Sequence, residues 1–330
     1  MEQTFLRDTF DRKIDYLRLS VTDRCDFRCL YCMAEEMTFL PKKEVLSLEE
    51  LIRVSDIFVQ LGVKKIRVSG GEPLIRKDAL LLLKQLGRLS SLEELCLTTN
   101  ASQLEKTAKD IYQAGVKRIN ISLDSLKPER FRQLTRHGDL NVVLRGIDKA
   151  LEQGFQGIKI NAVLMQQYNI DEIIDLADFA LKRGCDISFI EEMPLGEISS
   201  HSRAQEFISS AHVRNILSQK FDLKESTVTT GGPSKYWSVD GCKNKLGFIS
   251  PHSENFCASC NRVRVTAEGK LLLCLGNEDS LDLKALIRSE RNDDDIKQAI
   301  IAAMQYKPEK HEFNLDQPPQ ILRFMNATGG

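Results

Sequence analysis

The chain lacks the features that mark membrane-spanning, secreted or nucleic-acid-binding proteins. Its longest aliphatic run, residues 79–83, is far too short to cross a bilayer. Residues 1–8 include charged side chains and contain no apolar signal-peptide core. With 46 basic and 47 acidic residues the formal net charge is −1, so no overall field attracts nucleic acid or a membrane surface. We therefore expect a cytoplasmic protein with no nucleic-acid or membrane partner.

Cysteine, by contrast, is present in nine copies. In a cytoplasmic protein this indicates metal binding or catalysis rather than disulfides. Cys25, Cys29 and Cys32 form a C-x3-C-x2-C triplet. A 4Fe–4S cluster is usually held by four cysteines, so three would leave one iron open to another group. A structural zinc site, which normally closes all four positions, is the weaker alternative.

A second triplet, Cys257, Cys260 and Cys274, has the spacing C-x2-C-x13-C. The alternating residues around Glu268 predict a β-hairpin that returns Cys274 to the other two cysteines. With His252 nearby, the set fits a Cys3His zinc site. A second iron–sulfur cluster is the other interpretation, and the first triplet favours it.

Residues 17–220 have the pattern of six strand–helix pairs in series, which predicts a parallel sheet with right-handed crossovers. Three helices are expected to begin at capping boxes on Ser47, Ser102 and Asn169. The expected strands cover residues 17–21, 65–69, 94–98, 118–122, 157–163 and 186–191. The expected helices lie near residues 47–61, 78–89, 102–114, 141–153, 170–183 and 209–220.

These strands alternate polar and apolar residues, as where Arg18 and Ser20 lie opposite Leu17 and Leu19. Parallel strands buried on both faces are usually apolar throughout. We therefore expect the polar faces to line a wet interior. The fold class is then α/β: a partial (βα)6 TIM-like barrel in residues 1–222, followed by a smaller C-terminal iron–sulfur domain in residues 223–330. Residues 225–256, rich in Thr, Gly, Ser and Pro, are expected to be irregular.

Unusual polar loops follow the carboxyl ends of these strands, the edge where βα barrels form active sites. The first cysteine triplet follows the first strand, and Gly70-Gly71-Glu72-Pro73 follows the second. Paired glycines let a ligand approach the backbone closely, and the glutamate suits an ammonium group. This is not a phosphate loop of the G-x4-G-K-[ST] type.

Basic residues are expected to converge inside the barrel. Guanidinium groups bind phosphates bidentately, so such a set predicts a small polyanionic substrate. By strand parity, its members are Arg18, Arg67 and Lys159, joined by Arg262 and Arg264 on one face of the later hairpin.

In these motifs the chain resembles the radical S-adenosylmethionine (SAM) enzymes, with aromatic Tyr31 before the last cysteine of the first triplet. Three further features narrow the match: Gly70-Gly71-Glu72-Pro73, the second triplet with Asn261-Arg262-Val263-Arg264 between its last two cysteines, and terminal Gly329-Gly330. Over almost its whole length the chain is similar to the MoaA-type GTP 3′,8-cyclases of molybdenum cofactor biosynthesis.

The resemblance implies two 4Fe–4S clusters, S-adenosyl-L-methionine as cofactor and GTP as substrate. The cluster on Cys25, Cys29 and Cys32 would bind SAM and split it to a 5′-deoxyadenosyl radical. That radical would abstract H3′ of GTP, and C3′ would attack C8 to give 3′,8-cyclo-7,8-dihydro-GTP. The cluster on the second triplet would hold the guanine base.

The resemblance also implies roles for single residues. The tail residues Gly329 and Gly330 would enter the barrel and support catalysis. One departure is Ser188, where many family members carry arginine before Phe-Ile-Glu. The implied SAM contacts are Tyr31, Gly71, Ser122 and Met193. The implied GTP contacts are Arg18, Arg67, Thr98, Lys159, Arg262, Val263 and Arg264, with Lys65 as a possible helper.

The implied partners are a reductant such as flavodoxin, the next pathway enzyme, cyclic pyranopterin monophosphate synthase, and a second copy in a homodimer. Two other functions remain open. A radical SAM peptide-modifying enzyme with an auxiliary cluster usually carries more C-terminal cysteines. A non-catalytic iron–sulfur nucleotide-binding protein would not need the Gly-Gly-Glu-Pro loop or the inward polar strands.

Overall fold

The structure is a computed structural model that describes residues 5–289, 291–317 and 319–330. Within these residues the strands form one sheet in the order β12-β11-β10-β1-β2-β3-β4-β5-β6-β9-β8-β7. The six central strands run parallel, as expected, and their ends differ from the predicted ones by at most two residues. They are β1 Tyr16–Ser20, β2 Lys65–Ser69, β3 Glu94–Thr99, β4 Val116–Ser122, β5 Gly157–Leu164 and β6 Asp186–Glu191.

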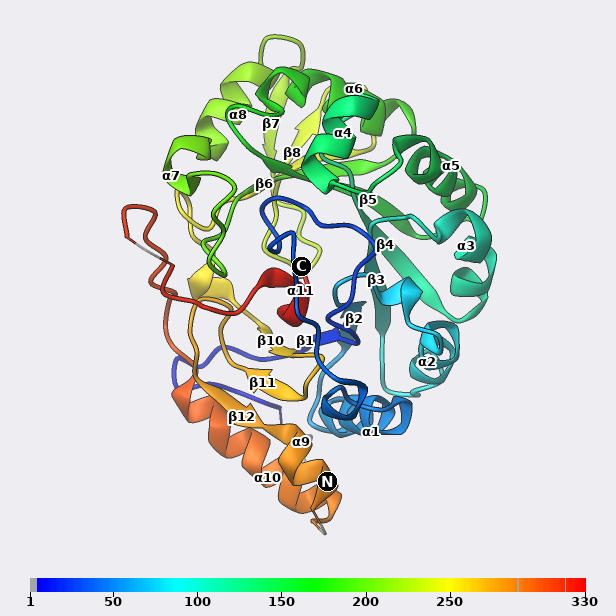
Figure 1. The fold of residues 1–330 in the computed structure, drawn as a ribbon, viewed down its shortest axis with the longest axis vertical. Coiled ribbons are helices and arrows are strands. Elements are labelled where there is room, and N and C mark those ends of the chain that lie inside the picture. The colour runs from blue at the N-terminus through cyan, green and yellow to red at the C-terminus, as the bar shows by residue number, and fades with distance from the viewer. Residues whose placement is uncertain (1–4, 290, 318) are drawn as a thin grey trace.

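Helices lie outside this curved sheet, and the C-terminal end of the chain lies in the middle of the ring (Figure 1). Pro128–Thr135 forms a helix that the sequence pattern missed. Short 3-10 turns cover Lys42–Glu44, Pro73–Ile75, Ile170–Glu172, Cys257–Ser259 and Met304–Tyr306. The helices along the barrel are α1 Leu48–Gln60, α2 Ala79–Leu86, α3 Leu104–Gln113, α4 Pro128–Thr135, α5 Leu140–Leu151, α6 Ile173–Lys182, α7 Arg203–Glu206 and α8 Ser210–Leu217.

The C-terminal part extends the sheet at both edges. The expectation that residues 225–256 are irregular is wrong, because two complete strands and the end of a third lie there. The expected hairpin is confirmed, with Arg264 opposite Leu272. The strands are β7 Leu223–Ser226, β8 Lys235–Val239, β9 Lys245–Ile249, β10 Arg262–Val265, β11 Lys270–Leu272 and β12 Ser280–Asp282. The helices are α9 Leu283–Arg288, α10 Asp293–Ala303 and α11 Met325–Thr328.

Two parallel pairings join the early and late parts of the chain. β10 lies beside β1, with Val263 opposite Leu17, and β9 lies beside β6, with Gly247 opposite Ser188. The sheet therefore continues across residue 222, and the division into domains at that residue stays a prediction. The late strands place the second cysteine triplet beside the opening of the barrel.

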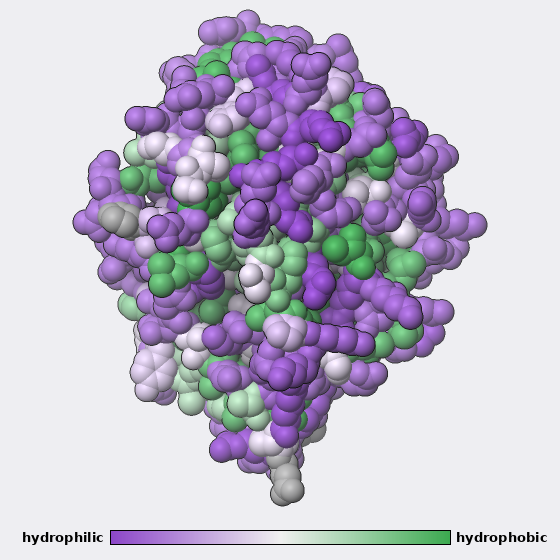
Figure 2. All heavy atoms as spheres, in the orientation of Figure 1, coloured by the Kyte–Doolittle hydropathy of each residue, from purple (hydrophilic) through white to green (hydrophobic). Residues whose placement is uncertain are grey.

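The apolar faces of the strands pack outward against the helices. Leu17, Leu19, Ile66 and Val68 are all nearly inaccessible to solvent. Figure 2, in the same view, shows hydrophilic residues around the periphery and hydrophobic ones gathered toward the middle of this face. Among the described residues, no helix is both long and apolar enough to cross a membrane.

Only one of the three expected capping boxes forms. Ser47 accepts a hydrogen bond from the Glu50 amide, and the Glu50 carboxylate accepts one from the Ser47 amide. The prediction for Ser102 is wrong, since its hydroxyl donates to Asp26 at 2.6 Å. That for Asn169 is also wrong, because its amide group donates to the carbonyls of residues 124 and 163. In both cases a tertiary partner takes the side chain away from the helix end.

Candidate active site

The inward faces of the strands and the late hairpin line a single cavity, which confirms the expected polar lumen. Side chains of alternate positions reach it, as the pleat of a strand requires. The basic and amide residues on its wall include Arg18, Lys65, Arg67, Asn120, Lys159, Asn161, Arg262, Arg264 and Lys307. The structure therefore brings together the whole basic set that the sequence predicted.

Lys65 pairs with Glu94 at 2.6 Å, but other basic groups in this cavity are poorly compensated. Burial lowers the pKa of Arg264 well below its usual range, and Arg18 and Arg262 lower it further. Burial likewise lowers the pKa of Lys159. Among the described residues Nε of Arg18 is buried without a hydrogen-bond partner. Buried cations and unpaired donors cost free energy unless an anion joins them, so the cavity fits a polyanion.

Tyr16 is a cavity residue that the sequence analysis missed. Its hydroxyl lies 2.7 Å from Nε of Arg67, which donates to it. Burial alone would raise the pKa of Tyr16, but Arg67 and Arg18 lower it to about 7. The signal was available, because Tyr16 has the same strand parity as Arg18.

The first cysteine loop leaves β1 and passes directly against the loop after β2. The amide of Gly71 donates to the carbonyl of Thr22 at 2.7 Å. A Cβ on Gly71 would lie 2.1 Å from the carbonyl oxygen of Arg24, so only glycine fits. The group that approaches this glycine is the cysteine loop itself. Both carboxylate oxygens of Glu72 accept hydrogen bonds, from Leu74, Thr99 and Asn100.

Cys25, Cys29 and Cys32 are free thiols on this loop. Sγ of Cys25 accepts from the Phe27 amide at 3.3 Å and from Nδ2 of Asn100 at 3.8 Å. Burial raises the pKa of Cys32 to about 12. A metal centre that binds thiolates supplies the positive charge such a site lacks, so this donor set fits a soft iron centre.

Cys257, Cys260 and Cys274 line the cavity. Burial, followed by repulsion from Cys274 and Cys260, raises the pKa of Cys257, so the three thiols are electrostatic neighbours. Cys260 differs: burial alone would raise its pKa, but Arg262 and Lys307 lower it.

The zinc alternatives find no support in this geometry. Nε2 of His252 lies 2.8 Å from the carbonyl oxygen of Glu192. In the part of the chain that the structure describes, no three His, Cys, Asp or Glu residues are placed to hold one metal ion. Each cysteine of a 4Fe–4S cluster binds a different iron, so its sulfurs stand farther apart than the ligands of one ion.

Most predicted SAM and GTP contacts meet in the cavity, between the two cysteine loops. Tyr31 reaches it from the first loop, and its hydroxyl donates to Asp124 at 2.7 Å. Gly71, Gly329 and the first triplet are not among its lining residues. The predicted site residues that do line the cavity are Arg18, Tyr31, Arg67, Thr98, Ser122, Lys159, Met193, Arg262, Val263, Arg264 and Gly330, together with the second triplet.

The C-terminal tail enters the lumen and bridges its two sides. The Gly329 carbonyl accepts from Nη1 of Arg264 at 2.5 Å. Gly329 has φ of 75°, and a Cβ there would lie 2.0 Å from Oγ of Ser69. The amide of Met325 donates to the Cys32 carbonyl at 3.2 Å. The tail therefore contacts both the first cysteine loop and the basic set.

Ser188 lies in the interior. It stands at the position where many members of the family that the chain resembles carry arginine. Its Oγ lies 2.9 Å from Oγ of Ser234. A Cβ on Gly247 would lie 2.6 Å from the Ser188 hydroxyl and 2.3 Å from that of Ser234. The side chains at this level of the barrel are small and uncharged, and the cations of the cavity come from other strands.

Comparison with known proteins gives full-length similarity. The Radical SAM superfamily pattern matches residues 19–180, and the Molybdenum Cofactor Synthesis C pattern matches residues 185–313. GTP 3′,8-cyclase of Saccharophagus degradans is 61% identical over 331 residues, 100% of both chains. GTP 3′,8-cyclase of Pseudomonas syringae pv. syringae is 56% identical over 332 residues, also 100% of both.

Among solved structures, Streptococcus suis SuiB bound to S-adenosylmethionine is similar with a TM-score of 0.61. It is 16% identical, and the match covers 96% of this chain and 78% of SuiB. SuiB bound to the precursor peptide SuiA gives a TM-score of 0.63 at 16% identity, over 95% and 76% of the two chains. At this identity the similarity concerns the fold, and it confirms the expected α/β barrel core.

Proposed function

The chain belongs to the GTP 3′,8-cyclase family of radical SAM enzymes, and we propose how its residues divide that family's reaction within one cavity. It is a radical SAM enzyme of the first step of molybdenum cofactor biosynthesis, with GTP as substrate and a 4Fe–4S cluster and SAM as cofactors. The full-length identity favours this function over the peptide-modifying and non-catalytic alternatives.

We assign the first cluster to Cys25, Cys29 and Cys32. When bound there, the cluster and SAM supply one-electron radical chemistry. We assign SAM binding to Tyr31, Gly71, Ser122 and Met193. Support comes from three of these four lining the cavity beside the cysteine loop. Gly71 contributes differently, by allowing the cysteine loop to pass at van der Waals distance.

We assign the GTP triphosphate to the buried basic set. The observation that carries this assignment is a group of converging cations with an unpartnered Nε on Arg18. Held at several points, the substrate keeps its ribose in a fixed position, and a fixed geometry is what a reactive radical step requires. The residues assigned to GTP as a whole are Arg18, Arg67, Thr98, Lys159, Arg262, Val263 and Arg264.

We further propose a second 4Fe–4S cluster on Cys257, Cys260 and Cys274, with the guanine base beside it. The support is that these thiols and Arg262 lie on the same cavity wall as the basic set. The distance between the triphosphate and the base would then fix the ribose between the two cysteine loops.

The tail has a positioning role in this proposal. Gly329 reaches the basic set through its contact with Arg264. The helix just before the two glycines, α11, contacts the first cysteine loop. A tail in this place also excludes water from the lumen, which protects a radical from side reactions.

The partners follow from the pathway. We propose flavodoxin or a similar protein as reductant and cyclic pyranopterin monophosphate synthase as the enzyme that takes the product. A homodimer and a cytoplasmic location stay predictions.

The direct test is anaerobic incubation of reconstituted protein with GTP, SAM and dithionite. The expected result is 5′-deoxyadenosine together with a cyclised GTP product. Cleavage of SAM without any GTP-derived product, at full iron loading, would reject the substrate assignment.

A further inference from the structure

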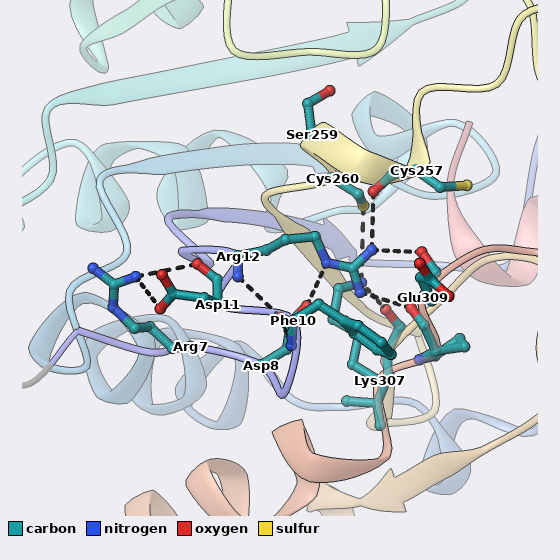
Figure 3. Close-up of polar contacts among 12 residues, drawn as sticks. Arg7, Asp8, Phe10, Asp11, Arg12, Cys257, Ser259, Cys260, Lys307 and Glu309 are labelled. Carbon is teal, nitrogen blue, oxygen red and sulfur yellow. Dashed lines mark hydrogen bonds and ion pairs between the residues drawn. The ribbon is translucent and has the colours of Figure 1, made fainter.

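A short segment, residues 307–311, wraps around the second cysteine triplet, and we call it the strap. Lys307 at its start is 2% exposed. Its Nζ donates to the Arg262 carbonyl at 3.1 Å and to the Leu273 carbonyl, and lies 3.8 Å from Sγ of Cys260. Figure 3 shows Lys307 below the turn that carries Cys257 and Cys260.

Arg12, from the other end of the chain, fixes the strap to the triplet. Its guanidinium donates to the carbonyl of Cys257 at 2.9 Å and to those of Pro308 and Glu309 at 2.6 Å (Figure 3). Asp8 forms an ion pair with the same guanidinium, with 2.6 Å between Oδ2 of Asp8 and Nε of Arg12. Both side chains of this pair are almost completely buried. Arg12 is therefore a fixed clamp rather than a mobile surface charge.

Within residues 5–289, 291–317 and 319–330, the ammonium of Lys307 has no carboxylate partner. It has three protons to donate, and within the described residues its three acceptors are two carbonyls and the sulfur of Cys260. A buried cation is costly unless an anion lies close by. A thiolate-ligated centre on the triplet would supply negative charge beside it, since Nζ lies 3.8 Å from Sγ of Cys260. The lysine thus fits the group that the proposed function places there.

The two triplets differ in the charge of their neighbours. The first triplet has both an acidic and a basic neighbour: Oδ1 of Asp26 lies 3.9 Å from Sγ of Cys25, and Nη1 of Arg28 donates to the Cys25 carbonyl at 2.5 Å. Asp124 bonds to Tyr31, the residue before Cys32. Beside the second triplet lie the cations of Lys307, Arg12 and Arg262. The strap contacts the second triplet through Lys307, so a change in the charge of Lys307 should act on the second centre.

We propose that Lys307 sets the reduction potential of the iron–sulfur centre on Cys257, Cys260 and Cys274, and that Arg12 holds Lys307 in the position to do so. This rests on the proposed second cluster. A hydrogen bond to a ligand sulfur and a nearby positive charge both stabilise the more negative, reduced form, and so raise the potential. Lys307 is a positioning residue here, since it acts on the centre through Cys260.

The test uses the full chain with Cys25, Cys29 and Cys32 replaced by alanine, so that only the second centre is loaded. In this background Lys307→Met, Lys307→Gln and Lys307→Arg are compared by anaerobic redox titration followed by electron paramagnetic resonance. Iron and sulfide are counted in each sample. Lys310→Met is the matched control, because it removes the same charge from an exposed position on the strap.

We expect Lys307→Met to favour the oxidised form by about tenfold, a shift of about 59 mV for one electron. Lys307→Arg and Lys310→Met should titrate like the parent. Lys307→Gln, which keeps a donor and loses the charge, should fall between Lys307→Met and the parent.

A loaded Lys307→Met centre with the parent's potential would overturn the proposal. Loss of the centre in both Lys307→Met and Lys307→Gln would overturn it too, since Lys307 would then be needed to retain the cluster. Absence of iron in the parent background itself would instead reject the second cluster, and so the proposed function at this site.

Discussion

The hydroxyl of Tyr16 accepts a hydrogen bond from Nε of Arg67 at 2.7 Å, in the middle of the buried basic set. Both residues line the substrate cavity. This contact fixes the plane of one guanidinium, while Nε of Arg18 beside it is buried without a hydrogen-bond partner among the described residues. The orientation of Arg67, one of the cations proposed to bind phosphate, is thus set before substrate arrives, which lowers the cost of binding.

Tyr16→Phe should weaken GTP binding. The change removes the acceptor for Arg67, and hydrogen bonds to charged groups contribute about 1.5–3 kcal/mol, so the KM for GTP should rise at least about tenfold. Steady-state kinetics under anaerobic conditions measure the KM for GTP in both proteins. Tyr306→Phe is the control, because Tyr306 is 73% exposed. An unchanged KM in Tyr16→Phe would show that Arg67 keeps its position without this contact.

The same tyrosine should make stability depend on pH. Its pKa in the folded protein is about 7, below the ordinary value of 10.0. Burial raises this pKa, but the positive charges of Arg67 and Arg18 lower it by more. Between these values the unfolded chain binds the proton that the folded chain has lost, so this contribution to stability grows as pH rises from about 7 to about 10. Chemical denaturation at pH 6 and pH 9 should show a larger wild-type advantage over Tyr16→Phe at pH 9. If wild type and Tyr16→Phe differed in unfolding free energy by the same amount at pH 6 and pH 9, Tyr16 would not be ionised in the folded protein.

The two cysteine triplets should be separable by function. Cys25→Ala should abolish SAM cleavage, since the first centre would lose a ligand. Cys257→Ala should leave slow SAM cleavage but stop GTP cyclisation. Chromatography of 5′-deoxyadenosine and of the GTP product measures both, with Cys242→Ala as a control outside either triplet. Retained SAM cleavage in Cys25→Ala would reject the first assignment, and retained cyclisation in Cys257→Ala the second.

Gly329→Ala should reduce turnover by more than about tenfold. The added Cβ would lie 2.0 Å from Oγ of Ser69, at a backbone φ of 75° that other residues rarely adopt. The tail would have to leave its place beside Arg264. Gly154→Ala is the matched control, with φ of 78° but nothing within 4 Å of its Cβ. Equal effects of the two changes on turnover would show that the tail contact is not needed.

The periodic parts of the fold were predictable. β2 and β6 have the predicted bounds, because alternating polar and apolar residues set both the strand and the face that lines the lumen. α4 was missed because its eight residues carry only a short apolar pattern. β8 and β9 were missed because glycine, proline and serine precede β8 at residues 231–234, and because their pairing partners are distant or irregular in pattern: β9 pairs with β6, and β8 pairs with β9.

The candidate site was predictable as far as strand parity and motif spacing reach. They identified Arg18, Arg67 and both cysteine triplets. They gave no sign of Lys307 or Arg12, whose partners lie 45 and 245 positions away in the chain. Contacts of that kind depend on the whole fold, so neither local propensity nor periodicity records them.

The pairing of β1 with β10 has a consequence for how the protein is made. β1 emerges early from the ribosome, but its neighbour on that side is synthesised only near the end. At roughly 5–20 residues per second, the roughly 250 intervening residues take on the order of ten to fifty seconds. During that interval one edge of β1 has no partner strand, and an unpaired edge invites association with other chains. A nascent chain that stalls before residue 262 should therefore depend on chaperones more than the finished protein does.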